Sequence, residues 1–139
     1  MNPVVHFEMP AEDMERMKKF YETAFGWETK DMGKEMGGYV VVTTSESEES
    51  DMARLPKKPG MINGGFYKKT EDVATHYPSV VIAVEDIKEA SKKVKEAGGQ
   101  VIGGQYKAGE PDDIPGVGLF SSIIDTEGNR VAILQPKGM

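Results

Sequence analysis

The segment Val4-Val5-His6-Phe7-Glu8-Met9-Pro10, followed by a helical pattern up to Phe25, decides the fold class. Along the segment, His6 and Glu8 share one face of a strand, and Phe7 and Met9 share the other. The apolar residues that follow recur at helical spacing and form one stripe: Met14, Met17, Phe20, Tyr21, Ala24 and Phe25. The sequence therefore predicts a strand that leads directly into an amphipathic helix.

The same strand-and-helix pattern returns after a constant offset of 73 residues. Asp13, the expected N-cap of the first helix, corresponds to Asp86, and Gly26, which is expected to end that helix, corresponds to Gly99. The chain is therefore predicted to be a single domain, residues 1–139, made of two repeats that span about 1–69 and 74–139.

Each repeat reads as strand, helix and three strands. Strands are predicted at 3–9, 27–31, 39–44, 61–67, 79–84, 100–106, 117–124 and 130–135. The polar segments 45–60 and 108–116 are predicted loops, and the first is interpreted either as an insertion tip or as a lid over a pocket. This order favours an α+β fold over the alternating βαβα order of a doubly wound sheet.

Composition narrows the function classes. The net charge of −6 argues against nucleic acid or an anionic membrane as the main partner. No apolar run approaches the roughly 20 residues of a membrane span, and the N-terminus lacks the pattern of a signal peptide, so a cytoplasmic location is expected. The absence of cysteine leaves only nitrogen and oxygen ligands for a metal.

Several motifs along the chain resemble those of one known superfamily. They are Val5-His6-Phe7-Glu8-Met9-Pro10, Phe25-Gly26-Trp27, Val84-Glu85-Asp86-Ile87, Ile114 to Gly118, and Asp125-Thr126-Glu127-Gly128-Asn129-Arg130-Val131. The ordered set is similar to the vicinal-oxygen-chelate superfamily, which contains glyoxalase I, extradiol dioxygenases, and bleomycin- and fosfomycin-resistance proteins. The resemblance implies tandem βαβββ repeats that form a cup-shaped, mostly antiparallel, eight-stranded sheet. It also implies a homodimer.

The resemblance implies a divalent metal at the mouth of the cup, held by the first and last strands of each repeat. The positions that correspond to the ligands are His6, Gly64 (to within one residue), Ser79 and Ala132. Only the histidine is a good ligand, so a site with three ligands is not available in the family's usual way. We therefore expect no metal and no cofactor, with His6 as a metal ligand only if a metal does bind.

His6 and Glu8 are the candidate catalytic residues, because a neutral imidazole beside a carboxylate can act as a base. The alternative is a structural polar pair near a strand edge. The candidates for lining the cup are Gly64, Phe66, Ser79, Phe120 and Ala132. His76, which precedes the fifth strand, is interpreted as a surface residue.

The sequence thus predicts a glyoxalase- or bleomycin-resistance-like protein that binds an unknown small molecule in its cup, without the family metal, as a binding protein in preference to an enzyme. One alternative is a metal-dependent lyase or dioxygenase with unconventional ligands such as His6, Glu8 and Gln135. A further alternative is a non-catalytic interaction module whose cup is filled by its own side chains.

Overall fold

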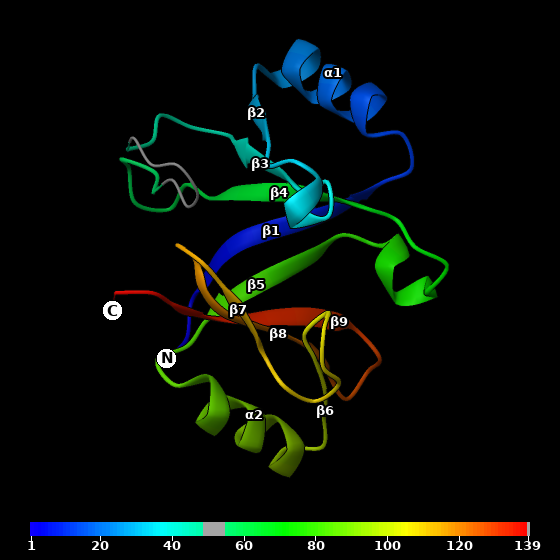
Figure 1. Cartoon of the computed structure of the whole chain (residues 1–139). Helices are drawn as coiled ribbons and strands as arrows, with labels where there is room; N and C mark the ends of the chain where they lie inside the picture. The colour runs from blue at the N-terminus through cyan, green and yellow to red at the C-terminus, as the bar shows by residue number, and fades with distance from the viewer. Residues whose placement is uncertain (49–54, 139) are drawn as a thin grey trace. The chain divides into compact units, whose positions relative to one another are not determined.

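A computed structural model of the chain describes residues 1–48 and 55–138. The chain divides into two compact units, which are described separately here. The N-terminal unit is His6–Pro78, and the C-terminal unit combines Met1–Val5 with Ser79–Met139. Figure 1 colours the chain from its blue N-terminus to its red C-terminus.

The described residues of the N-terminal unit carry four strands, one α-helix and two short 3-10 helices, and the first strand begins two residues before the unit does. These are β1 (Val4–Ala11), α1 (Met14–Phe25), β2 (Glu28–Asp31), η1 (Lys34–Met36), β3 (Val40–Thr43), β4 (Asn63–Lys68) and η2 (Val73–His76). The strands lie in the order β2-β3-β4-β1, with β1 parallel to β4 and the other neighbours antiparallel (Figure 1). The first and last strands of the unit are therefore neighbours.

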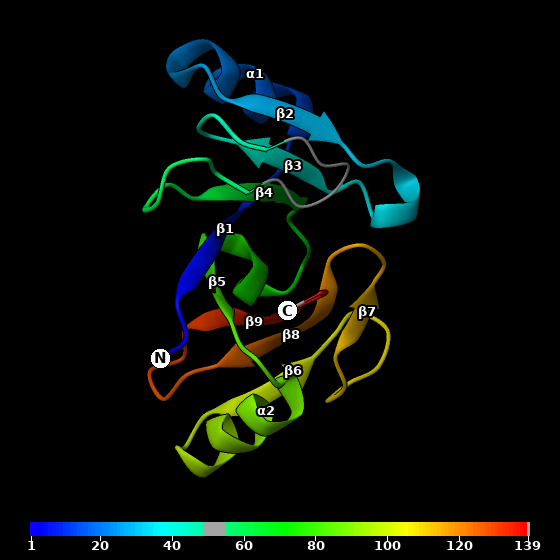
Figure 2. The same cartoon turned by 90° about the vertical axis from the view of Figure 1, so that its left-hand side faces the viewer.

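The C-terminal unit repeats this plan with one extra strand. Its elements are β5 (Ser79–Ala83), α2 (Ile87–Glu96), β6 (Gln100–Gly103), β7 (Asp112–Ile114), β8 (Gly118–Ile124) and β9 (Arg130–Pro136). The order is β5-β9-β8-β6, β7 pairs with β8, and only the β5–β9 pair is parallel (Figure 2). The tandem βαβββ architecture and the mostly antiparallel pairing predicted from the sequence are confirmed.

The predicted strand count of eight is wrong, because the described residues form nine strands. The additional strand, β7, lies inside the segment 108–116, which was predicted to be a loop. Pro111 and Pro115 bracket it and limit it to three residues at the edge of the sheet. In the other predicted loop, 45–60, residues 49–54 lie outside the described residues. The interpretation of this loop as a lid depends on them and so also lies outside the described part of the chain. Its described ends meet in a bridge between Ser47 and Pro56.

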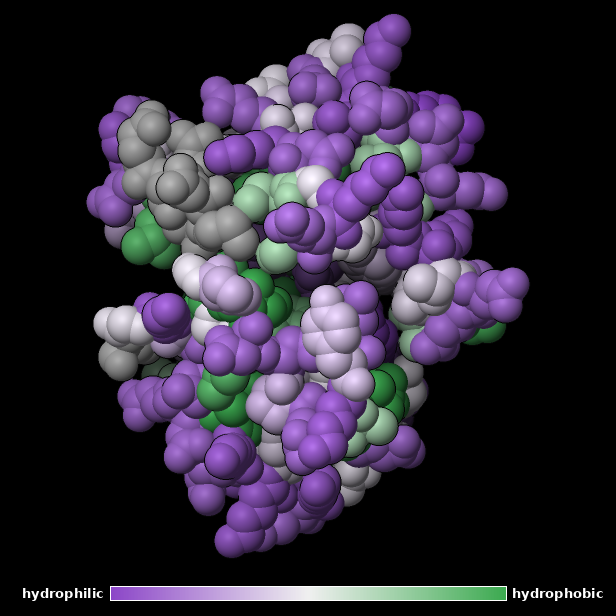
Figure 3. All heavy atoms as spheres, viewed as in Figure 1, coloured by the Kyte–Doolittle hydropathy of each residue, from purple (hydrophilic) through white to green (hydrophobic). Residues whose placement is uncertain are grey.

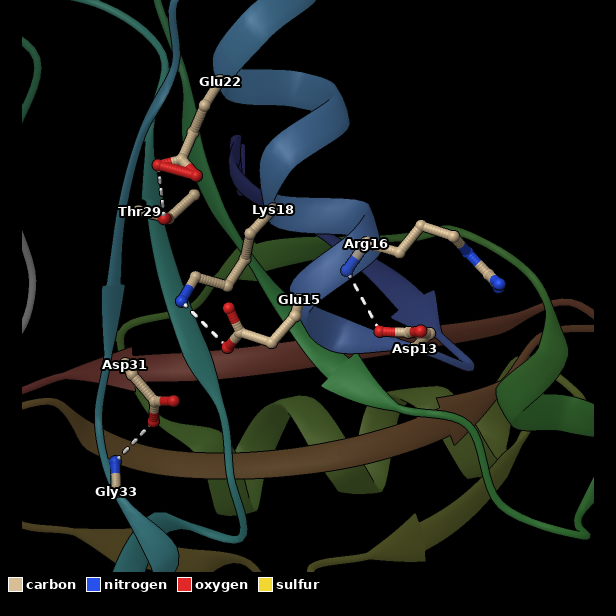
Figure 4. A network of polar contacts seen from close by, with 8 residues as sticks. All are labelled: Asp13, Glu15, Arg16, Lys18, Glu22, Thr29, Asp31 and Gly33. Carbon is tan, nitrogen blue, oxygen red and sulfur yellow. Dashed lines mark hydrogen bonds and ion pairs between the residues drawn. The ribbon is translucent and has the colours of Figure 1, made fainter.

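Both helices begin at the predicted aspartates. The Asp13 side chain accepts a hydrogen bond from the backbone N–H of Arg16, and Asp86 accepts from those of Lys88 and Glu89. Gly26 ends α1 in the left-handed conformation, with φ of 71°. Figure 4 shows the Asp13 cap together with the hydrogen bond from Thr29 on β2 to Glu22, which ties the end of α1 to the next strand.

Each unit has its own hydrophobic core between its helix and one face of its sheet. In the N-terminal unit, Val40, Val42 and Phe66 are fully buried and pack against residues of β1, α1 and Trp27. In the C-terminal unit, the core consists of Val84, Ile87, Ile123 and Ile133. The outer side of α2 is mostly charged, which agrees with the hydrophilic surface at the bottom of Figure 3. The opposite face of each sheet is its helix-free face.

No helix among the described residues has both the length and the apolar character needed to cross a membrane.

Candidate functional site

A polar cluster lies on the helix-free face of the N-terminal sheet. Because side chains alternate along a strand, His6 and Glu8 point away from the core that Phe7 and Met9 join. Glu8 is paired with Gly65 of β4, and Gly65 in turn is paired with Val41 of β3. The two predicted catalytic residues therefore share one face of the sheet.

Tyr39, which precedes β3, joins His6 and Glu8 into a chain of hydrogen bonds. Its hydroxyl lies 3.2 Å from Nε2 of His6 and is also hydrogen-bonded to the Glu8 side chain. Only 6% of Glu8 is exposed, whereas His6 and Tyr39 are half-buried. We call these three residues the His6–Tyr39–Glu8 relay. Tyr39 was not among the residues that the sequence singled out.

The surroundings shift the pKa values of His6 and Tyr39, each in the direction that favours the neutral form of the group. Burial lowers the pKa of His6 from 6.5 to about 4, so the imidazole is neutral at neutral pH. Burial, together with the negative charge of Glu8 and its hydrogen bond, raises the pKa of the Tyr39 phenol well above 10, and the charge of Tyr67 adds to the shift. At neutral pH the relay thus holds a neutral imidazole and a neutral phenol beside the Glu8 side chain.

A second group of hydrogen bonds fixes the start of β4 beside the relay. Asn63 is paired with His6 in the strand register and is 5% exposed. Its Oδ1 accepts from the backbone N–H of Thr44 at 2.9 Å, and its Nδ2 donates to Oγ of Ser47 at 2.8 Å. These contacts hold the chain leaving β3 against β4, and so they position the strand on which Gly65 lies.

Two of the predicted cup residues, Gly64 and Phe66, lie on the core face instead. Phe66 is 0% exposed and its ring packs 5.5 Å from that of Tyr21 on α1. A Cβ atom added at Gly64 would meet the ring of Phe7, which also belongs to the core. Gly65, and not Gly64, lies on the same face of the sheet as His6. The predicted cup position is therefore wrong by one residue, and Gly64 lies on the opposite face.

The remaining predicted cup residues, Ser79, Phe120 and Ala132, belong to the C-terminal unit. Ala132 is almost fully buried and is paired with Val81 on one side and Ser122 on the other. Phe120 is half-buried and pairs with Leu134, two residues further along β9. These positions share the helix-free face of that unit's sheet.

Ser79 stands where the repeat places the counterpart of His6. Its Oγ is buried and finds no hydrogen-bond partner within the described part of the chain. On the same face, Arg130 donates from its guanidinium to Oγ of Ser122 at 3.2 Å. The counterpart of the relay in the C-terminal unit is therefore built from hydroxyl groups and an arginine, and it holds no carboxylate–imidazole pair.

The residues at the four family positions do not fit a metal ion. The three positions other than His6 are a glycine, a serine and an alanine, and at Gly65 the hydroxyl of Tyr39 already fills the space where a side chain would begin. Within residues 1–48 and 55–138, no three histidine, aspartate or glutamate side chains are grouped so as to hold a metal.

Gln135, considered from the sequence as an unconventional ligand, has a structural role. It lies on the opposite face of β9 from Ala132, and its Oε1 accepts a hydrogen bond of 3.0 Å from the backbone N–H of Ile87 at the start of α2. The ligand interpretation of Gln135 is wrong, because a side chain that caps a helix on the core side does not reach the helix-free face.

His76 lies apart from the relay. It ends η2, and its Nε2 lies 2.7 Å from the backbone carbonyl oxygen of Thr70, to which it donates. The hydroxyl of Tyr67 donates nearby to the carbonyl oxygens of Thr75 and Tyr77, at 3.0 and 3.1 Å. The segment before β5 is thus held by backbone contacts.

Comparison with solved structures identifies the fold. The structure of methylmalonyl-CoA epimerase from Streptomyces coelicolor, in complex with 2-nitronate-propionyl-CoA, superposes with a TM-score of 0.68, covering 100% of this chain and 97% of that one at 13% identity. A hypothetical protein from Bacillus halodurans superposes with a TM-score of 0.66 over 99% of this chain and 96% of its own, at 14% identity. Identities this low show the fold alone.

Sequence comparison identifies the family. A glyoxylase-like domain-containing protein of Didymella fabae is 28% identical over 131 residues, which are 94% of this chain and 91% of the relative. The Mycobacterium bovis protein CFP32, whose name describes it as a glyoxylase, is 31% identical over 84% of this chain. The match spans only 38% of that protein. The model of the glyoxalase/bleomycin resistance protein/dioxygenase superfamily matches residues 4–133. The chain belongs to this superfamily.

Proposed function

We propose that the chain binds a small molecule at the His6–Tyr39–Glu8 relay and does so without the metal ion of its family. The observation that carries the proposal is the carboxylate of Glu8, which is 6% exposed and connected through Tyr39 to the more accessible His6. Burying a carboxylate costs free energy, and groups kept in this state at the surface of a sheet often belong to binding sites.

The superfamily supports this proposal in general terms. Structures with the same fold hold small organic ligands, and the epimerase structures contain 2-nitronate-propionyl-CoA or methylmalonyl-CoA. In this chain only His6, of the four residues at the family's ligand positions, is a good metal donor, and it lies beside the hydroxyl of Tyr39 in the His6–Tyr39–Glu8 relay. We also propose that the chain is a homodimer, as the resemblance to its superfamily implies, and that it is cytoplasmic. Sedimentation measurements would test its oligomeric state.

The metal half of the proposal is tested on untagged protein by elemental analysis and by titration with Zn²⁺, Ni²⁺, Mn²⁺ and Fe²⁺. The chain has two histidines, so His76→Ala is a matched control for His6→Ala. We expect no stoichiometric metal in any variant. Stoichiometric metal that is lost in His6→Ala and kept in His76→Ala would overturn the proposal and favour a metal-dependent lyase or dioxygenase.

The binding half is tested by thermal shift against a library of small polar molecules, with methylmalonyl-CoA as one member. We expect at least one compound to stabilise the wild-type protein, and to lose most of that effect in Glu8→Gln and Tyr39→Phe. Tyr21→Phe is the control, because its hydroxyl contacts Met9 in the core of the same unit. Equal stabilisation of all three variants would place the ligand elsewhere. No stabilisation by any compound would favour the interaction module.

A further inference from the structure

The predicted apolar stripe of α1 is divided between the core and the surface. Met14, Met17 and Tyr21 pack on the core of the N-terminal unit. Phe20 and Phe25 are 56% and 63% exposed, because Phe20 lies at the margin of the stripe and Phe25 is the last residue of the helix. The side of α1 that faces away from the sheet is therefore partly aromatic.

A shallow, mostly apolar groove runs along this exposed side of α1. Phe20 forms one wall of it, and the small side chains of Thr23 and Ala24 leave space beside the ring. Grooves between the rows of side chains on a helix are where the ridges of a second helix pack. We call the five lining residues, which are three or four positions apart as neighbours on a helix surface, the α1 groove: Arg16, Lys19, Phe20, Thr23 and Ala24.

The ring of Phe20 is held in place although it is exposed. It packs edge-on against Tyr21, with 4.9 Å between the ring centroids, and lies 6.3 Å from the ring of Phe25. Tyr21 is itself stacked on Trp27 at 4.7 Å. An aromatic side chain fixed in this way loses little conformational freedom when a partner covers it.

Two cations border the α1 groove, and none of the described residues that line it is acidic. Neither Arg16 nor Lys19 forms an ion pair with another described residue. The neighbouring Lys18 is paired with Glu15 at 3.3 Å, and Figure 4 shows the Arg16 side chain extending away from that pair. The groove is thus a positive site on a chain whose net charge is −6.

The second repeat shows that the fold does not require such a groove. With the offset of 73 residues, Phe20 corresponds to Lys93 of α2 and Thr23 to Glu96. With these charged residues α2 still packs on the core of its own unit. Packing within the unit therefore does not account for an aromatic residue at position 20, and exposed apolar surface of this kind marks an interaction site.

We propose that the α1 groove binds a short acidic, amphipathic helix of a partner protein. An apolar side chain of that helix packs beside Phe20, and its carboxylates pair with Arg16 and Lys19. This surface is separate from the His6–Tyr39–Glu8 relay, which lies on the helix-free face of the same sheet, so the proposal does not depend on the proposed function.

Charge complementarity selects this occupant. A second copy of the chain offers no acidic helix among its described residues, because its own α1 groove would bring two more cations. Its α2 carries more exposed lysines than glutamates: Lys88, Lys92, Lys93 and Lys95 against Glu89 and Glu96. The net charge of −6 disfavours an extended anionic surface, so the carboxylates must belong to a short segment.

The probe is a fluorescently labelled synthetic helical peptide with leucine at every third or fourth position and glutamate on both sides of that row. The control peptide carries lysine in place of every glutamate. Fluorescence anisotropy with the full chain should show binding of the acidic peptide that weakens with added salt. The basic peptide should bind at least about tenfold more weakly.

Variants of the chain locate the binding. Phe20→Ser and the double variant Arg16→Glu/Lys19→Glu should each weaken it by about tenfold or more. Lys92→Glu/Lys93→Glu on α2 changes the net charge by the same amount and should bind the peptide as the wild-type protein does. Absence of binding, equal binding of the two peptides, or equal affinity of the two charge-reversed variants would overturn the proposal.

Sedimentation distinguishes a second copy from a partner protein. We expect Phe20→Ser to leave the oligomeric state of the chain unchanged. A dimer that Phe20→Ser converts to monomers would mean that a second copy occupies the α1 groove, and it would overturn the proposal while leaving the proposed binding at the relay untouched.

Discussion

The hydroxyl of Tyr39 lies where the Cβ atom of residue 65 would stand if that residue were not glycine. Tyr39 directly precedes β3, and Gly65 lies within the neighbouring strand, β4. The absence of a side chain at residue 65 lets the phenol cross that strand to reach Glu8. The relay therefore depends on a glycine as much as on its three polar members.

Gly65→Ala should displace Tyr39 and break its hydrogen bonds to His6 and Glu8. Overpacking of this kind costs about 1–3 kcal/mol, measured as the change in the free energy of unfolding by urea. In a Tyr39→Phe background the hydroxyl that meets the new methyl group is absent, so the same substitution should cost less. A double-mutant cycle measures this coupling, and strictly additive costs would contradict the contact.

Glu8→Gln should lower the pKa of Tyr39 towards that of an ordinary tyrosine. The negative charge of Glu8 and its hydrogen bond both raise that pKa, while burial, which also raises it, remains in the variant. Ultraviolet difference titration detects tyrosine ionisation, and Tyr39→Phe identifies the transition that belongs to Tyr39. An unchanged transition in Glu8→Gln would mean that the carboxylate does not act on the phenol.

His6 should make the protein less stable in mild acid. Its folded pKa of about 4 lies below its ordinary value of 6.5, so between these two pH values the unfolded chain binds a proton that the folded chain does not. The stability that His6 contributes is complete above pH 6.5 and falls as the pH drops towards 4. At 1.36 kcal/mol per pKa unit the loss is at most about 3 kcal/mol.

Urea unfolding at several pH values within that range measures the effect. His6→Gln should flatten the dependence of stability on pH. His76→Gln should retain it, because His76 lies in η2 and donates to a backbone carbonyl outside the relay. Equal slopes in the wild-type protein and in His6→Gln would show that His6 is not buried as a neutral ring.

The sequence was sufficient for features that depend on local spacing. The alternation from His6 to Met9 and the aspartate caps at residues 13 and 86 are short-range patterns, and the structure contains them as predicted. The repeat offset also predicted that the succession of strand, helix and strands recurs in the second half of the chain. The three-residue β7 was missed, because prolines on both sides give it the composition of a loop.

The site was only partly predictable, because its contacts depend on the register between strands distant in sequence. His6 and Glu8 follow from alternation, but the choice between Gly64 and Gly65 needs the pairing of β1 with β4. Tyr39 offered one signal, an aromatic residue at the start of a strand that pairs with a strand containing two glycines. Aromatic side chains commonly cover such glycines, but that pairing is a property of the fold.

Gln135→Ala should destabilise α2 without any effect on the relay. The substitution removes the acceptor of the Ile87 backbone N–H, a hydrogen bond whose net contribution is about 1 kcal/mol, and Ile87 itself is 1% exposed in the core of the C-terminal unit. Urea unfolding gives the loss, and the ¹⁵N spectrum of His6 should stay as in the wild-type protein.

Gln135→Glu keeps an acceptor at this position, and it should recover most of the stability, because a negative charge at a helix N-terminus is favourable. Loss of metal or ligand binding in Gln135→Ala at unchanged stability would restore Gln135 as a site residue and contradict its role as a cap.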